Sequence, residues 1–530
     1  MPKERYWNKK TPEQKWDAIV IGSGMGGMTT AAMLAHFGKK VLVLEQHYVP
    51  GGFTHTFRRK GYEWDVGVHA VGEVTLHTLP GRILHALTEG TLEWASLGEY
   101  YEEMYYPDNF DIQFPSHPKK FREILLEKFP DEQDAIDQYF ALIKDVAGSM
   151  RSYYLSRILP SWARGIGDNM LAKKAQQYLE QRTSDVINGL TENTKLRHIM
   201  VAQWGYYGSL PKDSSFAMQA LVVRHFSHGG YYPVGGSSQI ATRLLKTVAD
   251  NGGWTKICAD VEEILIEKNK AVGVRLKDGE EIRAPQIISA AGVLPTLTRL
   301  LPEAARQQEW VDSITSQLRP SPAHLCLNIG FKGDIRSAGC SSANKWFWSV
   351  WSMEEREWDF DLEEIGTCPL LYCSFPSLKD PTHDPGPENK HTGEVVTFVP
   401  YETFQKWEGT PWRKRGEDYS ELKTRIQEAI LEQFLSQMPE LREMVDYVEL
   451  STPLSTTYFN RAAKGAIYGI EPTPERFQNP WLRPKSPIKG LYLSGSDVAS
   501  VGVIGAMMGG VLCAAAAAPT KALPFLKKML

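Results

Sequence analysis

The sequence predicts an α/β fold in which one parallel sheet is assembled from separate parts of the chain. A β-branched segment at 18–21 precedes a glycine-rich turn and a helical segment, and short strand-like segments return between residues 254 and 288. A last strand at 491–493 precedes a helix of small residues. Strands that alternate with helices favour a parallel sheet, so we expect these three regions to meet.

The first βαβ unit is the clearest of these regions. Residues 18–21 suit a buried parallel strand, residues 28–37 are typical of a helix that stops at Gly38, and residues 41–44 predict a second strand. That strand ends in Glu45, eighteen residues after the last glycine of the turn. A carboxylate at this place is expected to accept hydrogen bonds from ribose hydroxyls and to repel a 2′-phosphate.

The turn between the first strand and its helix, residues 22–27, has the pattern GxGxxG with one extra glycine, Gly26. Gly22 permits the tight turn, Gly24 lets the backbone approach a pyrophosphate, and Gly27 allows close packing of helix on strand. The free N–H groups of the helix N-terminus then face the phosphates. We therefore predict a dinucleotide site of the Rossmann type, against the alternative of an ordinary glycine-rich turn.

Length and charge limit the classes of protein that fit. A chain of 530 residues is too long for one core and should form two or three lobes. The net charge is −4 and no basic patch is visible, so we set nucleic-acid binding aside. Aromatic residues make up 11% of the chain, which fits either large cores or an apolar ligand channel.

Cysteine usage and hydropathy indicate the compartment. The six cysteines form no CxxC pair, which favours a reducing compartment and predicts no metal site. The first sixteen residues lack an apolar signal segment, and the apolar run 493–518 carries Asp497 and many glycines, so neither predicts a membrane span. We expect a cytoplasmic protein. Residues 522–530 could touch a membrane surface, but we expect a frayed tail.

Two further segments follow the first unit. Gly51 and Gly52 are expected to bring the backbone close to the cofactor. The alternation through residues 62–68 predicts a strand that delivers Asp65 and His69 to one region. For His69, a structural role and a role beside the cofactor remain equally open.

The middle of the chain differs in composition. Residues 76–224 are expected to form a mainly helical lobe, and residues 331–484, rich in tryptophan, its second half. Aromatic pairs there either line a pocket or pack in the core. The predicted substrate-binding domain is thus 76–224 with 331–484, and the predicted cofactor-binding domain is discontinuous, with residues 1–75, 225–330 and 485–530.

The return to the cofactor-binding domain begins after residue 229. A helix at 239–249 is expected to be capped by Ser237 or Ser238. Strands are then expected at 254–257, 261–267, 271–276 and 282–288. The final strand leads to Gly495, Asp497 and a helix at 502–517, which suits the far end of a cofactor.

Five segments together carry a family resemblance. They resemble the FAD-dependent phytoene desaturase and amine oxidase superfamily, and within it the branch of all-trans-retinol 13,14-reductases (retinol saturases) and carotenoid cis–trans isomerases. The segments are VIGSGMGGMTTAAMLAHFGKKVLVLEQH (20–47), HTFRRKGYEWDVGVHAVG (55–72), SSFAMQALVVRHFSHGGYYPVGGSSQIA (214–241), SFPSLKDPT (374–382) and GLYLSGSDVASVGVIGAMMGGVL (490–512).

The resemblance implies bound FAD in a Rossmann-type, glutathione-reductase-like domain, with a discontinuous α+β substrate domain. It also implies that Val261 presents its backbone to the adenine and that Asp497 binds the ribityl chain. Together with the turn, the predicted cofactor-binding residues are Gly22, Gly24, Gly26, Gly27, Glu45, Gly51, Gly52, Val261, Gly495 and Asp497.

The activity expected from the resemblance is FAD-dependent chemistry on a C=C bond of a long apolar polyene of retinoid or carotenoid type, with saturation favoured. Redox-neutral isomerisation, desaturation, amine oxidation and a non-catalytic lipid-binding flavoprotein remain alternatives. Polar side chains expected near the reacting ring are His55, Asp65, His69 and Tyr458. For each of these, a structural role competes with proton donation. No second nucleotide fingerprint identifies an electron donor.

Overall fold

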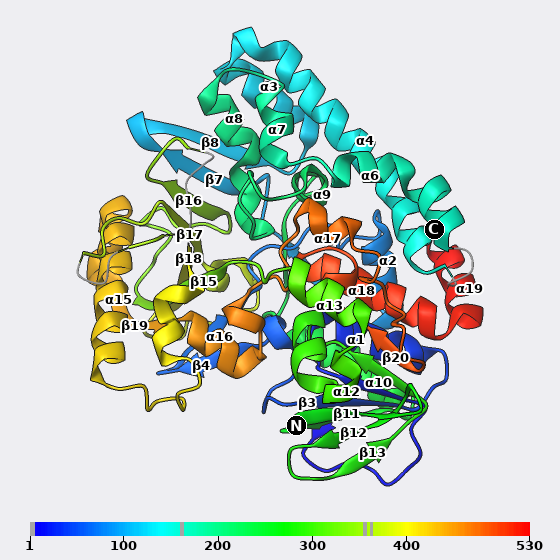
Figure 1. Ribbon diagram of the computed structural model, residues 1–530. Coiled ribbons are helices and arrows are strands. Elements are labelled where there is room, and N and C mark those ends of the chain that lie inside the picture. The colour runs from blue at the N-terminus through cyan, green and yellow to red at the C-terminus, as the bar shows by residue number, and fades with distance from the viewer. Residues whose placement is uncertain (1–5, 160–163, 353–357, 361–363) are drawn as a thin grey trace.

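A six-stranded parallel sheet is built from the two ends and the middle of the chain (Figure 1). The computed structural model describes residues 6–159, 164–352, 358–360 and 364–530. The strand order is β1-β10-β3-β2-β14-β20, and all neighbours are parallel. The strands are β1 (Trp7–Asn8), β2 (Ala18–Ile21), β3 (Val41–Glu45), β10 (Trp254–Ile257), β14 (Gln286–Ser289) and β20 (Leu491–Leu493). The three predicted regions therefore meet in one sheet.

Three helices pack beside this sheet through their apolar residues, and a buried hydrophobic cluster joins them to it. They are α1 (Met25–His36), α10 (Ser238–Asp250) and α18 (Gly502–Ala517). The helix α1 begins at Met25 rather than at residue 28, because the Gly24 carbonyl already accepts a hydrogen bond from the Met28 N–H at 2.9 Å. The glycine turn is therefore one tight element with the helix.

A small antiparallel sheet follows β10. It contains β11 (Val261–Glu267), β12 (Lys270–Leu276) and β13 (Glu281–Arg283). The single strand predicted at 282–288 is wrong, since the chain forms β13 and β14 with a break between them. Pro285 lies in that break, and proline has no N–H group to donate to a strand neighbour.

The predicted serine cap of α10 is also wrong. Ser237 occupies the N-cap position, but its side chain makes no capping bond. Its hydroxyl instead donates a hydrogen bond to the Asp65 carboxylate. A long-range contact has replaced the local one.

A seven-stranded sheet forms the second body of the molecule. Its order is β19-β15-β18-β17-β16-β7-β8, with β16 and β7 parallel and the other neighbours antiparallel. The strands are β7 (Tyr100–Tyr106), β8 (Phe110–Pro115), β15 (Ala323–Lys332), β16 (Asn344–Trp348), β17 (Leu370–Ser374), β18 (Lys390–Val399) and β19 (Val445–Ser451). Strands from both predicted parts of the substrate domain share this sheet, together with β15, most of which lies in the range 225–330 predicted for the cofactor-binding domain.

Helices cover this sheet at the top of Figure 1, and a large buried cluster of aromatic and aliphatic side chains lies between them. They are α3 (Pro118–Lys128), α4 (Gln133–Arg157), α5 (Arg164–Gly167), α6 (Lys173–Leu179), α7 (Thr183–Asn188), α8 (Thr194–Val201) and α9 (Phe216–His225). The expectation of a helical lobe at 76–224 holds for these helices, but the β7–β8 hairpin within the same range joins the sheet instead.

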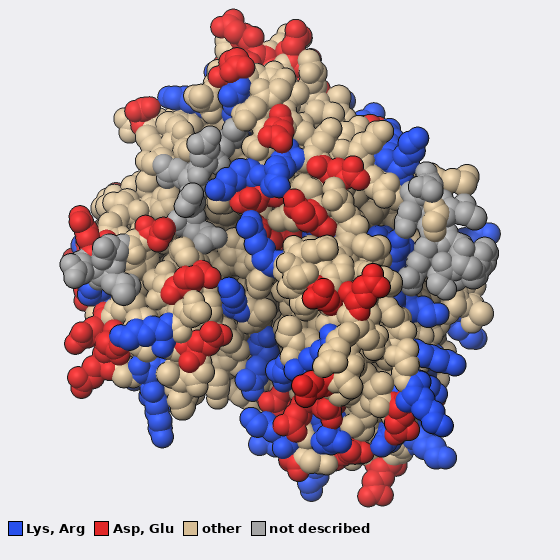
Figure 2. All heavy atoms as spheres, in the orientation of Figure 1, with Lys and Arg blue, Asp and Glu red and all other residues tan. Residues whose placement is uncertain are grey.

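The remaining elements pack around one of the two sheets or lie between them. The strands are β4 (Thr56–Arg59), β5 (Tyr62–Asp65), β6 (Trp94–Ser96) and β9 (Tyr231–Pro233). The helices are α2 (Leu79–Leu87), α11 (Val293–Pro295), α12 (Glu303–Arg306), α13 (Glu309–Gln317), α14 (Pro376–Lys379), α15 (Glu417–Gln437), α16 (Pro453–Asn460) and α17 (Pro474–Gln478). Acidic and basic side chains are interspersed over the face shown in Figure 2.

The C-terminal segment is not a frayed tail. It forms the helix α19 (Pro519–Met529), whose Ala522 is fully buried. The Arg82 guanidinium of α2 donates a hydrogen bond to the Met529 carbonyl at 2.6 Å, and the Phe525 and Phe37 rings lie 5.7 Å apart. Among the described residues, no helix combines the length and apolar character needed to cross a bilayer.

Candidate active site

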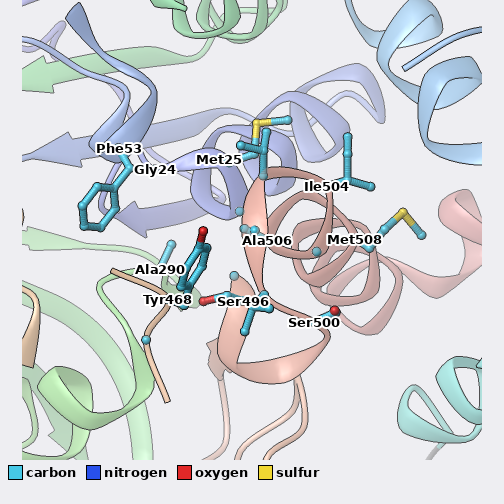
Figure 3. Close-up of a pocket in the computed structure, with 18 of the residues that line it drawn as sticks. Gly24, Met25, Phe53, Ala290, Tyr468, Ser496, Ser500, Ile504, Ala506 and Met508 are labelled. Carbon is cyan, nitrogen blue, oxygen red and sulfur yellow. The ribbon is translucent and has the colours of Figure 1, made fainter. Parts of the chain in front are cut away.

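One cavity of about 860 Å³ runs from the glycine turn to the helices of the second body. This volume lies within the range of about 300–1,000 Å³ that is typical of small-molecule sites. Figure 3 shows Gly24 and Met25 at the start of α1 across from Ser496, Ser500 and Ile504 near the start of α18. The N-termini of two helices therefore open onto the same space, which favours negatively charged or electron-rich groups.

The glycine turn has the geometry expected for close approach of a dinucleotide. Gly22 has a φ of +92°, and a Cβ built on Gly24 would meet no atom within 4 Å. A Cβ on Gly27 would lie 2.1 Å from the Gly22 carbonyl oxygen, so this glycine permits the helix to pack on the turn. Gly22 and Gly24 line the cavity, whereas Gly27 lies behind it.

The extra glycine has its own function in packing. A Cβ on Gly26 would lie 2.4 Å from the Cα of Gly495. Gly26 therefore makes room for the closing segment of the chain. Both residues line the cavity, so two segments more than 450 residues apart in the sequence form one wall of it.

The Glu45 carboxylate is buried and held in place at the end of β3. One oxygen accepts hydrogen bonds from the Ser23 N–H at 3.0 Å and from the Ser23 hydroxyl at 2.5 Å. The other accepts a bond from the His47 N–H at 2.7 Å. A carboxylate offers about four acceptor positions, so capacity remains for a ribose hydroxyl. Glu45 lines the cavity, as a ribose-binding residue would.

Gly51, Gly52 and Val261 surround this end of the cavity. Gly51 donates a hydrogen bond from its N–H to the Ser23 hydroxyl at 3.0 Å, and a Cβ on Gly52 would lie 2.9 Å from the Cα of Gly24. Gly52 and Val261 line the cavity, whereas Gly51 supports it from behind. The role of Val261 toward an adenine stays a prediction.

Asp497 ties together three segments of the cavity wall. Its carboxylate oxygens accept hydrogen bonds from the Val293 N–H at 2.7 Å and from the Ile470 N–H at 2.8 Å. Both of its partners follow glycines, Gly292 and Gly469, that also line the cavity. Asp497 is therefore positioned at the cofactor end of the cavity, and its bond to a ribityl hydroxyl stays a prediction.

Two of the four polar candidates for the reaction, His55 and Tyr458, lie in different surroundings. His55 lines the cavity, its Nδ1 lies 2.6 Å from the Gly52 carbonyl oxygen, and burial lowers the pKa of its ring to about 4. Tyr458 is 42% exposed and stacks on Trp412 with ring centres 5.7 Å apart, outside the lining of the cavity. Proton donation by either residue stays a prediction.

The structure brings Asp65 and His69 to one region, as the alternation at 62–68 predicts. The Asp65 N–H donates a hydrogen bond to Oε1 of Glu394 at 2.8 Å, and Oε2 of the same carboxyl lies 2.9 Å from Nδ1 of His69. His69 lines the cavity, whereas the Asp65 carboxylate is buried behind it and accepts hydrogen bonds from the Tyr232 and Ser237 hydroxyls. Glu394 thus bridges the two candidates.

The sequence interpretation missed Glu394 and Lys379. Lys379 is buried, and its ammonium donates hydrogen bonds to the His69 carbonyl and the Ser374 hydroxyl, each at 2.7 Å, and to the Asn344 side chain. Two signals were present: a single ionisable residue, a glutamate, within the segment 393–399, and a lysine in the segment 374–382 that carries the family resemblance.

We expect Gly26→Ala to destabilise the protein even without a cofactor, because the new methyl group cannot occupy the place of Gly495. Overpacking of this kind typically costs about 1–3 kcal/mol. The unfolding temperature of the cofactor-free protein measures this loss of stability. Gly24→Ala is the matched control, since its methyl group enters open space; equal unfolding temperatures for the two variants would contradict the packing described here.

Comparison with known proteins agrees with this geometry. The family model for flavin containing amine oxidoreductases matches residues 25–518. The all-trans-retinol 13,14-reductase of Danio rerio is 34% identical over 96% of this chain and 87% of its own length. The chloroplastic prolycopene isomerase of Daucus carota is 26% identical over 94% of this chain and 80% of its own length.

Solved structures share the fold. Putrescine oxidase bound to putrescine matches with a TM-score of 0.63 at 14% identity, over 96% of this chain and all of that chain. Cyclohexylamine oxidase from Brevibacterium oxydans matches with a TM-score of 0.61 at 16% identity, over 97% of this chain. A single family match over most of the chain, a dinucleotide cradle and this fold confirm the predicted fold class and cofactor. The chain belongs to the flavin containing amine oxidoreductase family and is an FAD-dependent oxidoreductase.

Proposed function

We propose that this chain reduces one C=C bond of a long apolar polyene of the retinoid or carotenoid type. The observation that carries the proposal is the continuity of the cavity, which leads from the glycine cradle into an apolar passage between α4, α9 and α19. The apolar part of its lining is Ala147, Met150, Tyr154, Leu155, Ile158, Met218, Leu221, Val222, Leu526 and Leu530, and the polar side chains Arg151, Arg224 and His225 of the same helices also line it. The retinol reductase relatives, at about one-third identity, act by name on such a substrate.

The lining fits the needs of a polyene. Such a molecule has few polar groups, so its binding energy comes mainly from buried apolar surface, at about 25 cal/mol per Å². When bound, FAD supplies the two-electron chemistry, because its reduced form can donate a hydride to a conjugated double bond. The residues of this chain hold the substrate beside the cofactor, exclude water from the passage and supply polar groups at its inner end.

Anaerobic mixing of the reduced FAD-loaded protein with all-trans-retinol, or with a carotenoid, tests the proposal. Reoxidation of the cofactor together with a product heavier by two hydrogens supports saturation. An unchanged mass with a shifted polyene spectrum would instead indicate isomerisation, the activity named for the carrot relative. Peroxide formation from amines, with no reaction of polyenes, would contradict the proposal and favour amine oxidation.

We further propose that α19 contacts a lipid surface from which the substrate enters. Leu530 and Leu155 line the cavity and are also exposed at its outer end. Leu523 of α19 is 53% exposed, and Lys527 and Lys528 follow it in the same helix. Apolar side chains flanked by lysines favour the surface of an anionic bilayer.

We expect Leu523→Glu to weaken co-sedimentation with phosphatidylserine-containing vesicles and to slow the reaction of a polyene dissolved in those vesicles. The reaction of detergent-dispersed polyene should be unchanged, because Leu523 lies outside the cavity lining. Tyr48→Glu, at a similarly exposed side chain outside α19, is the control. Equal vesicle binding by both variants and the parent would contradict the contact.

A further inference from the structure

A cluster of buried charged side chains lies directly behind His69. It contains the carboxyl groups of Asp65, Glu102 and Glu394 and the ammonium group of Lys379, all of them at least 96% buried. A single lysine cannot balance three carboxylates, and unpaired charges away from water are costly. The cluster must therefore hold protons on its carboxyl groups.

The contact between Glu394 and His69 is the point where this cluster reaches the cavity. Oε2 of Glu394 and Nδ1 of His69 approach within 2.9 Å, and within the described residues neither of these buried atoms is committed to a hydrogen bond. Two such atoms can share one proton, either as carboxyl to imidazole or as imidazole to carboxylate. The ring of His69 lines the cavity, so its other nitrogen, Nε2, is the one available to a bound molecule.

We propose that Glu394, acting through His69, supplies the proton that completes reduction of the substrate double bond. This inference rests on the proposed function of the site. Here His69 is the catalytic residue, because it faces the reacting atoms, and Glu394 is the positioning residue that stores the proton behind it. The sequence interpretation included His69 but had no source for its proton.

The step balances as a concerted transfer. With FAD bound and reduced, the cofactor would supply a hydride, with its two electrons, to one carbon of the double bond, and Nε2 of His69 would give its proton to the neighbouring carbon. The π bond breaks and two C–H bonds form. As Nε2 loses its proton, Nδ1 takes the proton of the Glu394 carboxyl, so the imidazole ends neutral in its other tautomer. The starting state returns when Nε2 takes up a proton from the cavity side and Nδ1 gives its proton back to the Glu394 carboxylate.

The surroundings favour this direction of transfer. Burial raises the pKa of Glu394 to about 8 and lowers the pKa of His69 to about 3, so the proton rests on the carboxyl at neutral pH. The Lys379 ammonium partly opposes the rise in the Glu394 pKa and stabilises the carboxylate once the proton has left. The Asp65 N–H, which donates a hydrogen bond to Oε1, also lowers the Glu394 pKa and stabilises the carboxylate.

Other ionisable groups face the pair from several elements. Burial also raises the pKa of Asp65 to about 7 and lowers the pKa of Lys379 to about 8. The ionisable groups whose pKa values are coupled to Glu394 or His69 are Asp65, His324, Cys326, Tyr232, Tyr372 and Lys379. The Asp65 carboxylate accepts hydrogen bonds from the Ser237 and Tyr232 hydroxyls, whereas Oε2 of Glu394 faces His69 alone among the residues that the structure describes.

Infrared titration of the FAD-loaded protein without substrate tests the stored proton independently of any activity. We expect a carbonyl band of a buried protonated carboxyl that disappears near pH 8 and is absent in Glu394→Gln. The Asp65 and Glu102 carboxyls, whose pKa values burial raises to about 7, should give bands that disappear at lower pH and remain in this variant. The matched control is Glu103→Gln, because the Glu103 carboxylate is paired with Lys345 instead. The band's persistence in Glu394→Gln, or its absence above pH 6 in the parent protein, would overturn the proposal.

The reaction itself gives the second readout. Because the protonated carboxyl is required, substrate-driven reoxidation in the parent protein should slow as pH rises past about 8. In Glu394→Gln the rate should no longer depend on pH around 8. It should fall by about 10²–10⁴-fold, the usual range for a lost proton donor, with KM little changed. An unchanged rate and pH profile would contradict the transfer. If the parent protein reduces no polyene, the proposed function fails, while the infrared result still decides whether Glu394 stores a proton.

Discussion

Replacing Glu45 with arginine is expected to give a protein that binds no FAD. The buried carboxylate accepts three hydrogen bonds from Ser23 and His47 and lies where the ribose hydroxyls should bind. A guanidinium has no acceptor for any of these donors, and it places a longer, positively charged side chain in the ribose position. Visible flavin absorbance of the purified protein, before and after incubation with FAD, measures the loss.

Folding must be separated from binding in this experiment, because Glu45 also supports the turn. Circular dichroism of Glu45→Arg shows whether the fold is retained. Gly24→Val provides a second variant, since a Cβ at this position meets no protein atom within 4 Å and the added side chain points into the space expected for the cofactor. A fully yellow Glu45→Arg protein, or full FAD content in Gly24→Val, would contradict the placement of the cofactor.

Filling the apolar passage is expected to stop polyene reduction without removing FAD. Ala147 on α4 lines the cavity, so Ala147→Trp would place an indole in the passage. A polyene that loses about 100 Å² of buried contact loses about 2.5 kcal/mol of binding at about 25 cal/mol per Å². This corresponds to a loss of between about 10- and 100-fold in kcat/KM, measured by anaerobic reoxidation with increasing polyene.

Ala141→Trp is the matched control for this prediction. Ala141 lies on the same helix but is exposed to solvent, so the same substitution leaves the cavity unchanged. Both variants should keep the parental FAD content. Equal kinetics for Ala147→Trp and the parent protein would show that the substrate does not use this passage.

Much of the cofactor half of the molecule follows from local patterns in the sequence. The β-branched strand, the glycine turn and the acidic residue after β3 lie within about thirty residues, and each has a short-range cause. The boundaries of β2, β10, β11 and α18 agree with the sequence expectation. The strand predicted at 282–288 fails only because Pro285 interrupts the pairing.

The parts that the sequence did not predict depend on contacts between distant segments. Gly26 is small because Gly495 lies against it, and Ser237 bonds to Asp65 rather than to its own helix. Glu394 and Lys379 come into contact with His69 only when β18 and α14 pack behind it. A single glutamate within the segment 393–399 is a visible signal, but its partners cannot be identified without the three-dimensional arrangement.

The central claim is that the glycine turn and the closing segment hold FAD beside an apolar substrate passage. A crystal structure of the FAD-loaded protein with a bound polyene tests this most directly. We predict the adenosine ribose at Glu45, the flavin ring near the start of α18, and the polyene between α4 and α9 with a double bond beside the ring and His69. A polyene bound elsewhere, or FAD away from the glycine turn, would contradict the account.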